Sequence, residues 1–418
     1  MNMRELGRGA NSRLVMTCHL FRATNIPVFF SCGVAIVTLL LGSNLLQWPI
    51  YFFWRICSYG RRRDRGSTKI AMITMAVLLL SSCGISVGEP ILTIQSPDGD
   101  VIDCLNTMDQ PSLKNPLLKN HIFQETPSDH VKREDDGFGL QVWHSEGITC
   151  PRGTIPIRRF DKNISHTKYD PLVPNAADRA TKGHKAKIKW QPVYGTKASL
   201  SVWSPIVEFP ADFSLAQIWL VSGQYEENNL NTIEAGWQVS NTPFFCIALE
   251  AAITRTSTYG GDQFAITLQL WKDVFTGNWW MGMGENIVPI GYWPAEIFTS
   301  LSDHATTVQW GGEVYRNTSG RNTTLQMGSG KYPNKGFRQA AYFCNIRIAK
   351  ENRTLLPIED FVIGGTQLDS YTIRKSHSKV CGTHFYYGGP GPLRSAASVR
   401  GDYLSIVYLL LLSFYFLV

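Results

Sequence analysis

Short runs of alternating apolar and polar residues recur between Trp190 and Gly391, and they constrain the fold more than any other feature of the chain. The runs include ASLSVW, FSLAQIWL, QFAITLQLW and TTVQW, with Gly, Asn and Pro between them. A period of two is typical of strands with one buried face, and the intervening residues favour tight connections. No segment in this region sustains a helical period over several turns. The sequence therefore predicts an all-β fold, an antiparallel β-sandwich, over residues 190–391.

The 418 residues exceed one average domain, so further segments precede the sandwich. Residues 89–161 are a mixed polar segment that we expect to be a small separate domain. Residues 162–189 are rich in Lys, His, Pro and Asn, which predicts an exposed linker.

Two apolar segments lie near the N-terminus. Residues 28–46 are nearly uncharged and long enough for a membrane span of about 20 residues. Residues 69–88 read as a signal peptide, with the apolar run IAMITMAVLLL before small residues suited to cleavage. Residues 1–68 are then either an extension with an anchor or sequence upstream of a natural start at Met72 or Met75. We favour the second interpretation.

Residues 392–418 end in an apolar tail. A lipid-anchor signal would explain this ending, although its polar spacer is shorter than the usual ~8–12 residues. Secretion is the expected location, and membrane association through the terminal apolar segments is the alternative.

Charge and motifs exclude several classes of function. The net charge of +7 is mild, and no basic face is interleaved with aromatic residues, so we expect no nucleic-acid partner. Neither C-x-x-C nor a Cys/His metal spacing is present, so no metal site is predicted. The sequence also lacks H-E-x-x-H and a papain-like cysteine signature. Four N-x-[ST] acceptors indicate a lumenal or extracellular route: Asn163, Asn317, Asn322 and Asn352.

Several strings of the sequence match one known family in order. Residues 96–121 and CPRGTIPIRR at 150–159 resemble the start and end of the family's activation domain. The strings YGTKASLSVWSPIV, FSLAQIWLVSG, NTIEAGWQV, KDVFTGNWWM, GYWPAEIF, WGGEV, QMGSGKYP and FYYGGPG follow in the family's order. Together these strings resemble the neprosin-like plant proteins, and the resemblance covers most of residues 91–391.

The resemblance implies a secreted zymogen whose pro-domain, residues 89–161, inhibits a catalytic β-sandwich in the same chain. It implies a glutamic endopeptidase that cuts proline-containing polypeptides after proline at acid pH. Neither a metal nor an organic cofactor is expected.

Glu234 in T-I-E-A-G-W and Glu313 in W-G-G-E-V match the positions of the family's catalytic glutamates. Two neighbouring carboxyl groups can activate a water and supply a proton, because their repulsion keeps one protonated while the other is ionised. The alternative is two strand glutamates that face solvent. A glycosidase also uses two carboxylates, so the substrate must discriminate the two reactions.

Aromatic and glycine residues near these glutamates are candidates for a substrate groove: Trp237, Trp279, Trp280, Trp310, Gly311 and Gly312. Ordinary packing in the sandwich core is the alternative for each tryptophan. The glycines would let a substrate backbone approach Glu313, or they mark a bulge.

The resemblance is interrupted after Val239, where relatives continue through a longer stretch with a cysteine pair. Here residues 241–249 lead directly into AAITRTSTYGG. Loss of strands exposes sheet edges and removes core. The alternative function is therefore a catalytically impaired relative that binds cell-wall material, glycan or peptide.

Two cysteine pairs are disulfide candidates in this secretory context. Cys344 and Cys381 pair near the end of the sandwich, the alternative being two buried thiols. Cys104 and Cys150 are a second candidate pair within the pro-domain.

Overall fold

The structure is a computed structural model. It describes residues 13–22, 89–128, 141–144, 147–159, 181–209, 212–224, 226–240, 252–253, 255–316, 325–366 and 369–390. The predicted membrane span at 28–46, signal peptide at 69–88 and C-terminal tail at 392–418 lie outside these residues. Within the described ranges, no helix is long and apolar enough to cross a membrane.

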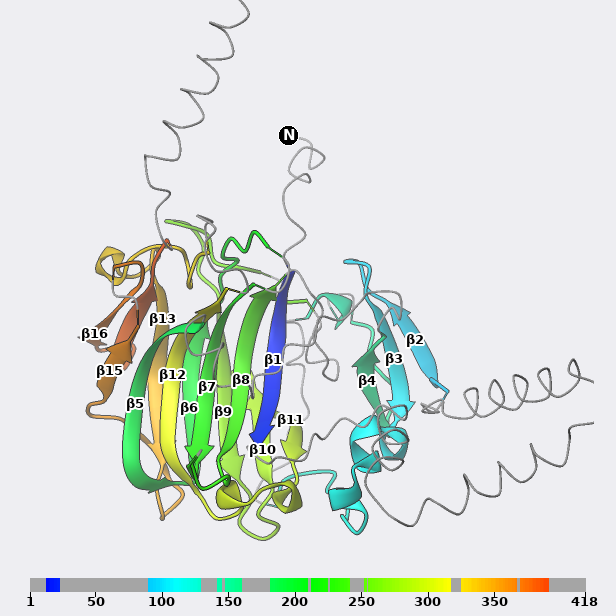
Figure 1. Ribbon diagram of the computed structural model, residues 1–418. Coiled ribbons are helices and arrows are strands. Elements are labelled where there is room, and N and C mark those ends of the chain that lie inside the picture. Colours follow the sequence, from blue (N-terminus) through cyan, green and yellow to red (C-terminus); the bar gives the residue numbers. More distant parts are fainter. Residues whose placement is uncertain are drawn as a thin grey trace, which may run out of the picture. The chain divides into compact units, whose positions relative to one another are not determined.

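The chain folds as an antiparallel β-sandwich, as predicted (Figure 1). The first sheet has six strands in the order β1 (Arg13–Arg22), β8 (Asn231–Ser240), β7 (Phe213–Ser222), β12 (Ala305–Tyr315), β5 (Thr181–Val193) and β15 (Val362–Gly365). The second sheet has eight strands. Its main order is β11 (Val288–Trp293), β10 (Trp279–Met283), β9 (Ala265–Lys272), β6 (Gly195–Ser201), β13 (Ala341–Ala349), β17 (Gly382–Gly388) and β16 (Thr372–Ser378), and β14 (Leu355–Pro357) pairs with β13.

The helices of the described regions are all short 3-10 helices. They are η2 (Thr107–Asp109), η3 (Pro111–Lys114), η4 (Pro116–Leu118), η5 (Val142–His144), η7 (Ala295–Ile297), η8 (Ser300–Ser302) and η9 (Pro333–Lys335).

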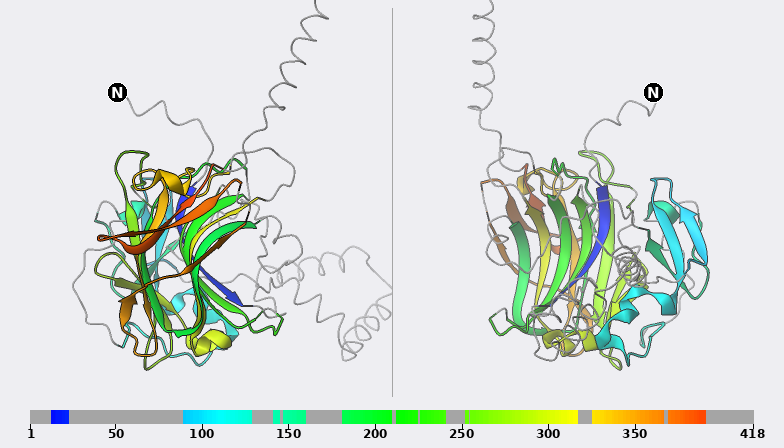
Figure 2. Two further views of the ribbon diagram at one scale, coloured as in Figure 1. Left: turned by 90° about the vertical axis from the view of Figure 1, so that its left-hand side faces the viewer. Right: turned by 45° about the vertical axis from the view of Figure 1, so that its right-hand side comes forward.

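The core lies between the two sheets, which stack as layers in the further views (Figure 2). Alternate residues of each strand point inward and interdigitate there. Large side chains from both sheets are fully buried in this one cluster, including Trp237, Trp310, Phe343 and Phe385.

The predicted linker at 162–189 is wrong in its last part, because residues from Thr181 onward form β5. The strand pairs with β12 on one side and β15 on the other. His184 and Ala186 are buried, whereas Lys185 and Lys187 are half-buried on the opposite face. The segment therefore alternates with the period of two that is typical of a strand, although its basic composition favours a linker.

The sheet edge at β8 is paired, which differs from the exposed edge expected after loss of strands. Residues 13–22, from the predicted N-terminal extension, form β1. Its register runs from Arg13 opposite Ser240 to Arg22 opposite Asn231, so the two strands pair along their whole length. Backbone pairing satisfies the donors and acceptors that an edge would otherwise leave open.

A third sheet lies between β1 and β5 in the sequence and contains β2 (Leu92–Gln95), β3 (Val101–Asn106) and β4 (Thr154–Arg158). The chain between β3 and β4 contacts the second sheet of the sandwich. Gln124 and Ser128 bind the carboxylate of Asp273, with the Ser128 amide 2.6 Å from Oδ2. His121 lies 2.9 Å from Glu296 and 2.8 Å from the hydroxyl of Tyr292.

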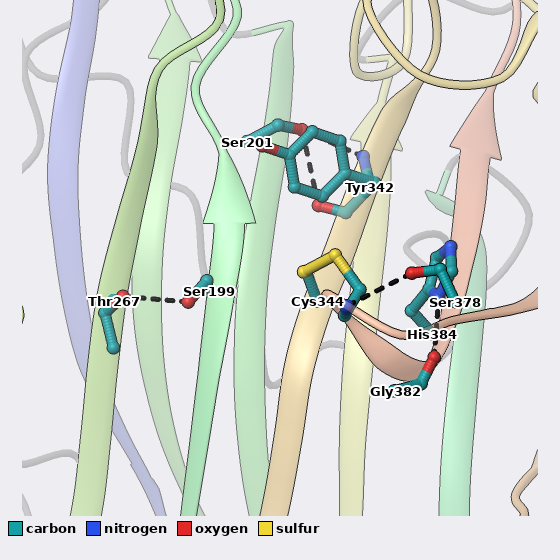
Figure 3. The surroundings of a disulfide bond; sticks show 9 residues. Ser199, Ser201, Thr267, Tyr342, Cys344, Ser378, Gly382 and His384 are labelled. Atoms are coloured by element: carbon teal, nitrogen blue, oxygen red, sulfur yellow. Dashed lines mark hydrogen bonds between the residues drawn. A yellow bond between two sulfur atoms is a disulfide. The ribbon is translucent and has the colours of Figure 1, made fainter.

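Two disulfides confirm the predicted cysteine pairs. Cys344 on β13 bonds to Cys381 just before β17, with the Cα atoms 4.9 Å apart (Figure 3). Cys104 on β3 bonds to Cys150, with the Cα atoms 5.5 Å apart. Closing loops of this length stabilises the fold by about 3–4 kcal/mol each in the chain-entropy account.

Candidate active site

Glu234 and Glu313 lie on the same face of the six-stranded sheet. Glu234 on β8 is opposite Trp219 on β7, and Glu313 on β12 is opposite Leu215 on β7. Trp219 and Leu215 are separated by an even number of residues, so they share a face, and their cross-strand partners share it with them. This face points away from the sandwich core, because the adjacent residues Ala235 and Val314 belong to that core.

Burial and hydrogen bonds define the environment of Glu234. Thr232 Oγ1 donates to its Oε1 at 3.2 Å, and the Trp219 side chain also forms a hydrogen bond with it. Burial first, and then the negative charge of Glu313, raise the pKa of Glu234 to about 7. Lys185 and the two hydrogen bonds act in the opposite direction. Glu234 is thus protonated in weak acid, and the negative charge of Glu313 helps to keep it protonated.

Glu313 forms an ion pair with Lys185 on the neighbouring β5. The Lys185 Nζ is 2.8 Å from Glu313 Oε2, with the two side chains 24% and 19% exposed. The same Nζ lies 3.8 Å from the centroid of the Trp219 ring, a cation–π geometry. One lysine and one tryptophan therefore connect the surroundings of the two glutamates.

Gly311 lies between Lys185 on β5 and Gln217 on β7, on the glutamate face. Having no side chain, it leaves room for Lys185 to extend across β12 toward Trp219. A Cβ at Gly311 would lie 2.2 Å from the carbonyl oxygen of His184, so the close approach of β12 and β5 requires glycine here.

The groove prediction is wrong for Gly312, because this residue lies on the core face of β12. A Cβ there would lie 2.3 Å from the ring of Tyr387. Its contact partner is a core side chain, so it is not placed to admit a substrate backbone beside Glu313.

The groove prediction is also wrong for three tryptophans, which occupy the core instead. Trp237, Trp279 and Trp310 are fully buried, and their indole nitrogens donate to Ser201 O, Leu301 O and Thr196 Oγ1. The reason is strand geometry. Trp237 and Trp310 are each three residues from a glutamate, and an odd separation places two residues on opposite faces of a strand.

Trp280 belongs to the second sheet, away from the glutamate face. Its ring lies 4.7 Å from that of Tyr292, and it is buried where the Gln124 segment covers the sheet. The prediction that it lines a groove with Glu234 and Glu313 is therefore also wrong.

Sequence reasoning missed Lys185 and Trp219. Lys185 lies in the predicted linker, although the alternation of Lys with His184, Ala186 and Ile188 is a signal of a strand. Trp219 lies in a predicted strand, FSLAQIWL, but only the pairing of β7 with β8 places it beside Glu234.

Of the predicted glycosylation acceptors, Asn352 is exposed in the turn after β13, and Asn163, Asn317 and Asn322 lie outside the described residues. Within the described ranges, no group of three or more His, Cys, Asp or Glu residues is arranged to hold a metal ion.

Comparison with known proteins gives two matching family models. The model described as Neprosin matches residues 210–245 and 246–390, and the model described as Neprosin activation peptide matches residues 93–170. The two Neprosin stretches meet within the interval where the sequence pattern is interrupted. Among solved structures, the chain is similar to a crystal structure of Scytalido-glutamic peptidase with a peptide-based transition state analog. The identity is 11% and the TM-score 0.28, covering 50% of this chain and 98% of that chain.

Proposed function

The chain belongs to the neprosin family of glutamic-type peptidases, with an activation peptide ahead of its catalytic domain, and from this we propose that it is an acid-active endopeptidase that cleaves after proline. Glu234 and Glu313 perform the hydrolysis. The observation that carries the proposal is that Glu234, on the same sheet face as Glu313, has its pKa raised by burial and by the charge of that partner. Acid–base chemistry with two carboxyl groups requires one that keeps its proton under the reaction conditions.

Each glutamate has a distinct role in the proposed mechanism. Glu313, ion-paired with Lys185, acts as the carboxylate base and takes a proton from water while the water oxygen attacks the peptide carbonyl carbon. Glu234, protonated below about pH 7, donates its proton to the carbonyl oxygen. Collapse of the tetrahedral intermediate breaks the C–N bond as the amine takes the proton held by Glu313 and the oxygen returns its proton to Glu234.

The upper limit of the pH range follows from Glu234. Its proton is lost as the pH rises through about 7, and the donor to the carbonyl oxygen is lost with it. Activity is therefore expected in weak acid and should decline toward neutral pH.

Glutamine substitutions test this function. Glu234→Gln and Glu313→Gln should each remove most turnover of a proline-containing peptide at pH 5, because an amide cannot exchange the required proton. Glu285→Gln, in the exposed turn between β10 and β11, is the matched control and should retain activity. EDTA should not inhibit the wild type. Folding of each variant is checked by circular dichroism, because a buried Gln without partners is destabilising.

Three outcomes would contradict the proposal. A folded wild type that cleaves no proline peptide between acid and neutral pH would favour the binding-protein alternative, and cleavage of a polysaccharide would indicate a glycosidase. Turnover that survives both glutamine substitutions would mean that other residues carry the reaction.

The zymogen part of the proposal assigns an inhibitory role to residues 89–161, which contain the three-stranded sheet. Because β5 begins at Thr181, we place the activating cleavage between residues 162 and 180, ahead of that strand. The two disulfides support a secretory route, since such bonds persist in oxidising compartments. If the precursor gains activity at acid pH without losing mass at its N-terminal side, the inhibitory role is excluded.

A further inference from the structure

The ammonium group of Lys185 lies in the gap between the two glutamates rather than beside one of them. On one side its Nζ forms the ion pair with Glu313. On the other side the same atom lies over the ring of Trp219, whose side chain forms a hydrogen bond with Glu234. A substrate bond held between the two carboxyl groups therefore lies next to this ammonium group.

Lys185 keeps both a hydrogen-bonding capacity and access to solvent. An ammonium group has three N–H donors and no acceptor. The carboxylate of Glu313 accepts from one of them, and the ring of Trp219 attracts the charge through its π face. The Lys185 side chain is 24% exposed, so a substrate atom can reach it. Gly311, opposite Lys185 on β12, has no side chain that would separate the two.

Negative charge develops on the substrate close to this group in the proposed reaction. As water attacks the carbonyl carbon, an electron pair of the C=O bond moves onto the oxygen, which stays negative until Glu234 has transferred its proton. The carbon lies about 3 Å from the water that Glu313 holds, and the oxygen is about 1.2 Å from the carbon. These lengths bring the oxygen within reach of Lys185, whose Nζ is 2.8 Å from the Glu313 carboxylate. A carbonyl oxygen has two lone pairs, so it can accept from Glu234 and Lys185 together.

We propose that Lys185 is a third catalytic residue, whose ammonium group donates a hydrogen bond to the carbonyl oxygen of the scissile bond and stabilises the negative charge that develops there. The inference rests on the proposed peptidase function and adds a residue to its mechanism. A cation aimed at a developing charge stabilises the transition state more than the bound substrate. Its removal should therefore lower kcat and leave KM nearly unchanged.

Two peptide probes that resist cleavage test this contact without turnover. In one, a phosphinate, which is anionic and tetrahedral, replaces the scissile amide after a proline. In the other, an uncharged ketomethylene group replaces the same amide. Their dissociation constants are measured by isothermal titration calorimetry at pH 5 on the acid-treated protein. Lys185→Gln should weaken binding of the phosphinate roughly tenfold and leave binding of the ketomethylene peptide unchanged.

Lys187→Gln is the matched control variant. Lys187 is the next lysine on the same face of β5, and it is opposite Gln309 rather than Gly311. The variant removes the same charge but leaves the contact with Glu313 in place, so it should bind the phosphinate as tightly as the wild type does. Lys185→Arg keeps the positive charge and should retain part of the affinity for the phosphinate. Circular dichroism verifies that each variant is folded.

The outcomes separate failure of this inference from failure of the peptidase function. Unchanged phosphinate binding in Lys185→Gln, or an equal loss for both probes, would overturn the contact with the carbonyl oxygen while the peptidase function stands. An equal loss of phosphinate binding in Lys187→Gln would assign the effect to the overall positive charge of β5 and would also overturn it. If the wild type binds neither probe, the peptidase function fails, and the inference fails with it.

Discussion

The Nζ of Lys185 lies 2.8 Å from Oε2 of Glu313. The same atom is 3.8 Å from the ring centroid of Trp219, which is hydrogen-bonded to Glu234. The two glutamates are therefore linked through a cation and an aromatic ring as well as by their own repulsion. This arrangement favours one ionised and one protonated carboxyl group, which is the state that the proposed reaction needs.

Substitution of Lys185 by Gln should lower kcat and move the alkaline limb of the pH–rate profile. Lys185 lowers the pKa of Glu234, so its removal should raise that pKa above its value of about 7 and extend activity to higher pH. Loss of the ion pair should lower kcat at pH 5 roughly tenfold. A full pH profile of kcat for the wild type, Lys185→Gln and Lys185→Arg measures both effects. A lower kcat with an unmoved alkaline limb would restrict Lys185 to a structural role.

Two substitutions at Trp219 separate its hydrogen bond from its aromatic ring. Trp219→Phe removes the indole hydrogen bond to Glu234 but keeps a ring beneath Lys185, so kcat should fall only about two- to tenfold. Trp219→Leu removes both contacts and should lower kcat further. Because the hydrogen bond lowers the pKa of Glu234, both variants should move the alkaline limb upward. Equal kcat values for the two variants would mean that the ring contributes nothing.

Gly311→Ala should destabilise the sandwich where β12 meets β5. The new Cβ would lie 2.2 Å from the carbonyl oxygen of His184, and backbone atoms cannot move aside as a flexible side chain can. The expected loss is about 1–3 kcal/mol in the free energy of unfolding, measured by urea denaturation. Gly364→Ala on β15 is the control, because its Cβ would meet no atom within 4 Å. Equal stability of the two variants would show that the strands separate without cost.

His184 should make the fold less stable in acid. Its ring is fully buried in the core, and burial lowers its pKa to about 4 from an ordinary value of 6.5. The unfolded chain therefore binds a proton that the folded chain does not bind between these values. The stability contribution is complete above pH 6.5 and is lost as the pH falls toward 4, by an amount on the order of 2–3 kcal/mol.

Urea unfolding of the wild type and His184→Gln at pH 7 and pH 4.5 tests this prediction. The difference in stability between the two pH values should be smaller in the variant, which has no titrating group at this position. A difference of the same size in both proteins would assign the acid sensitivity to other residues.

Much of this protein follows from local sequence. Alternation with a period of two predicts the strands, and the two disulfides agree with the pairs Cys344–Cys381 and Cys104–Cys150. The same period, applied to Trp237 and Trp310, would have placed both on the face opposite to the nearest glutamate. The strand period and the face of each residue depend on one strand at a time, so the sequence alone determines them.

Only the tertiary structure decides which strands are neighbours and in which register. Register places Trp219 opposite Glu234 and aligns Lys185 with Gly311, although 34 positions separate Lys185 from Trp219 in the chain. It also pairs residues 13–22 with β8 and makes residues 181–193, at the end of a basic segment, a strand inside the sheet. Pairing between distant strands depends on the closure of long loops and on the burial of a shared core, and no local window of sequence contains either.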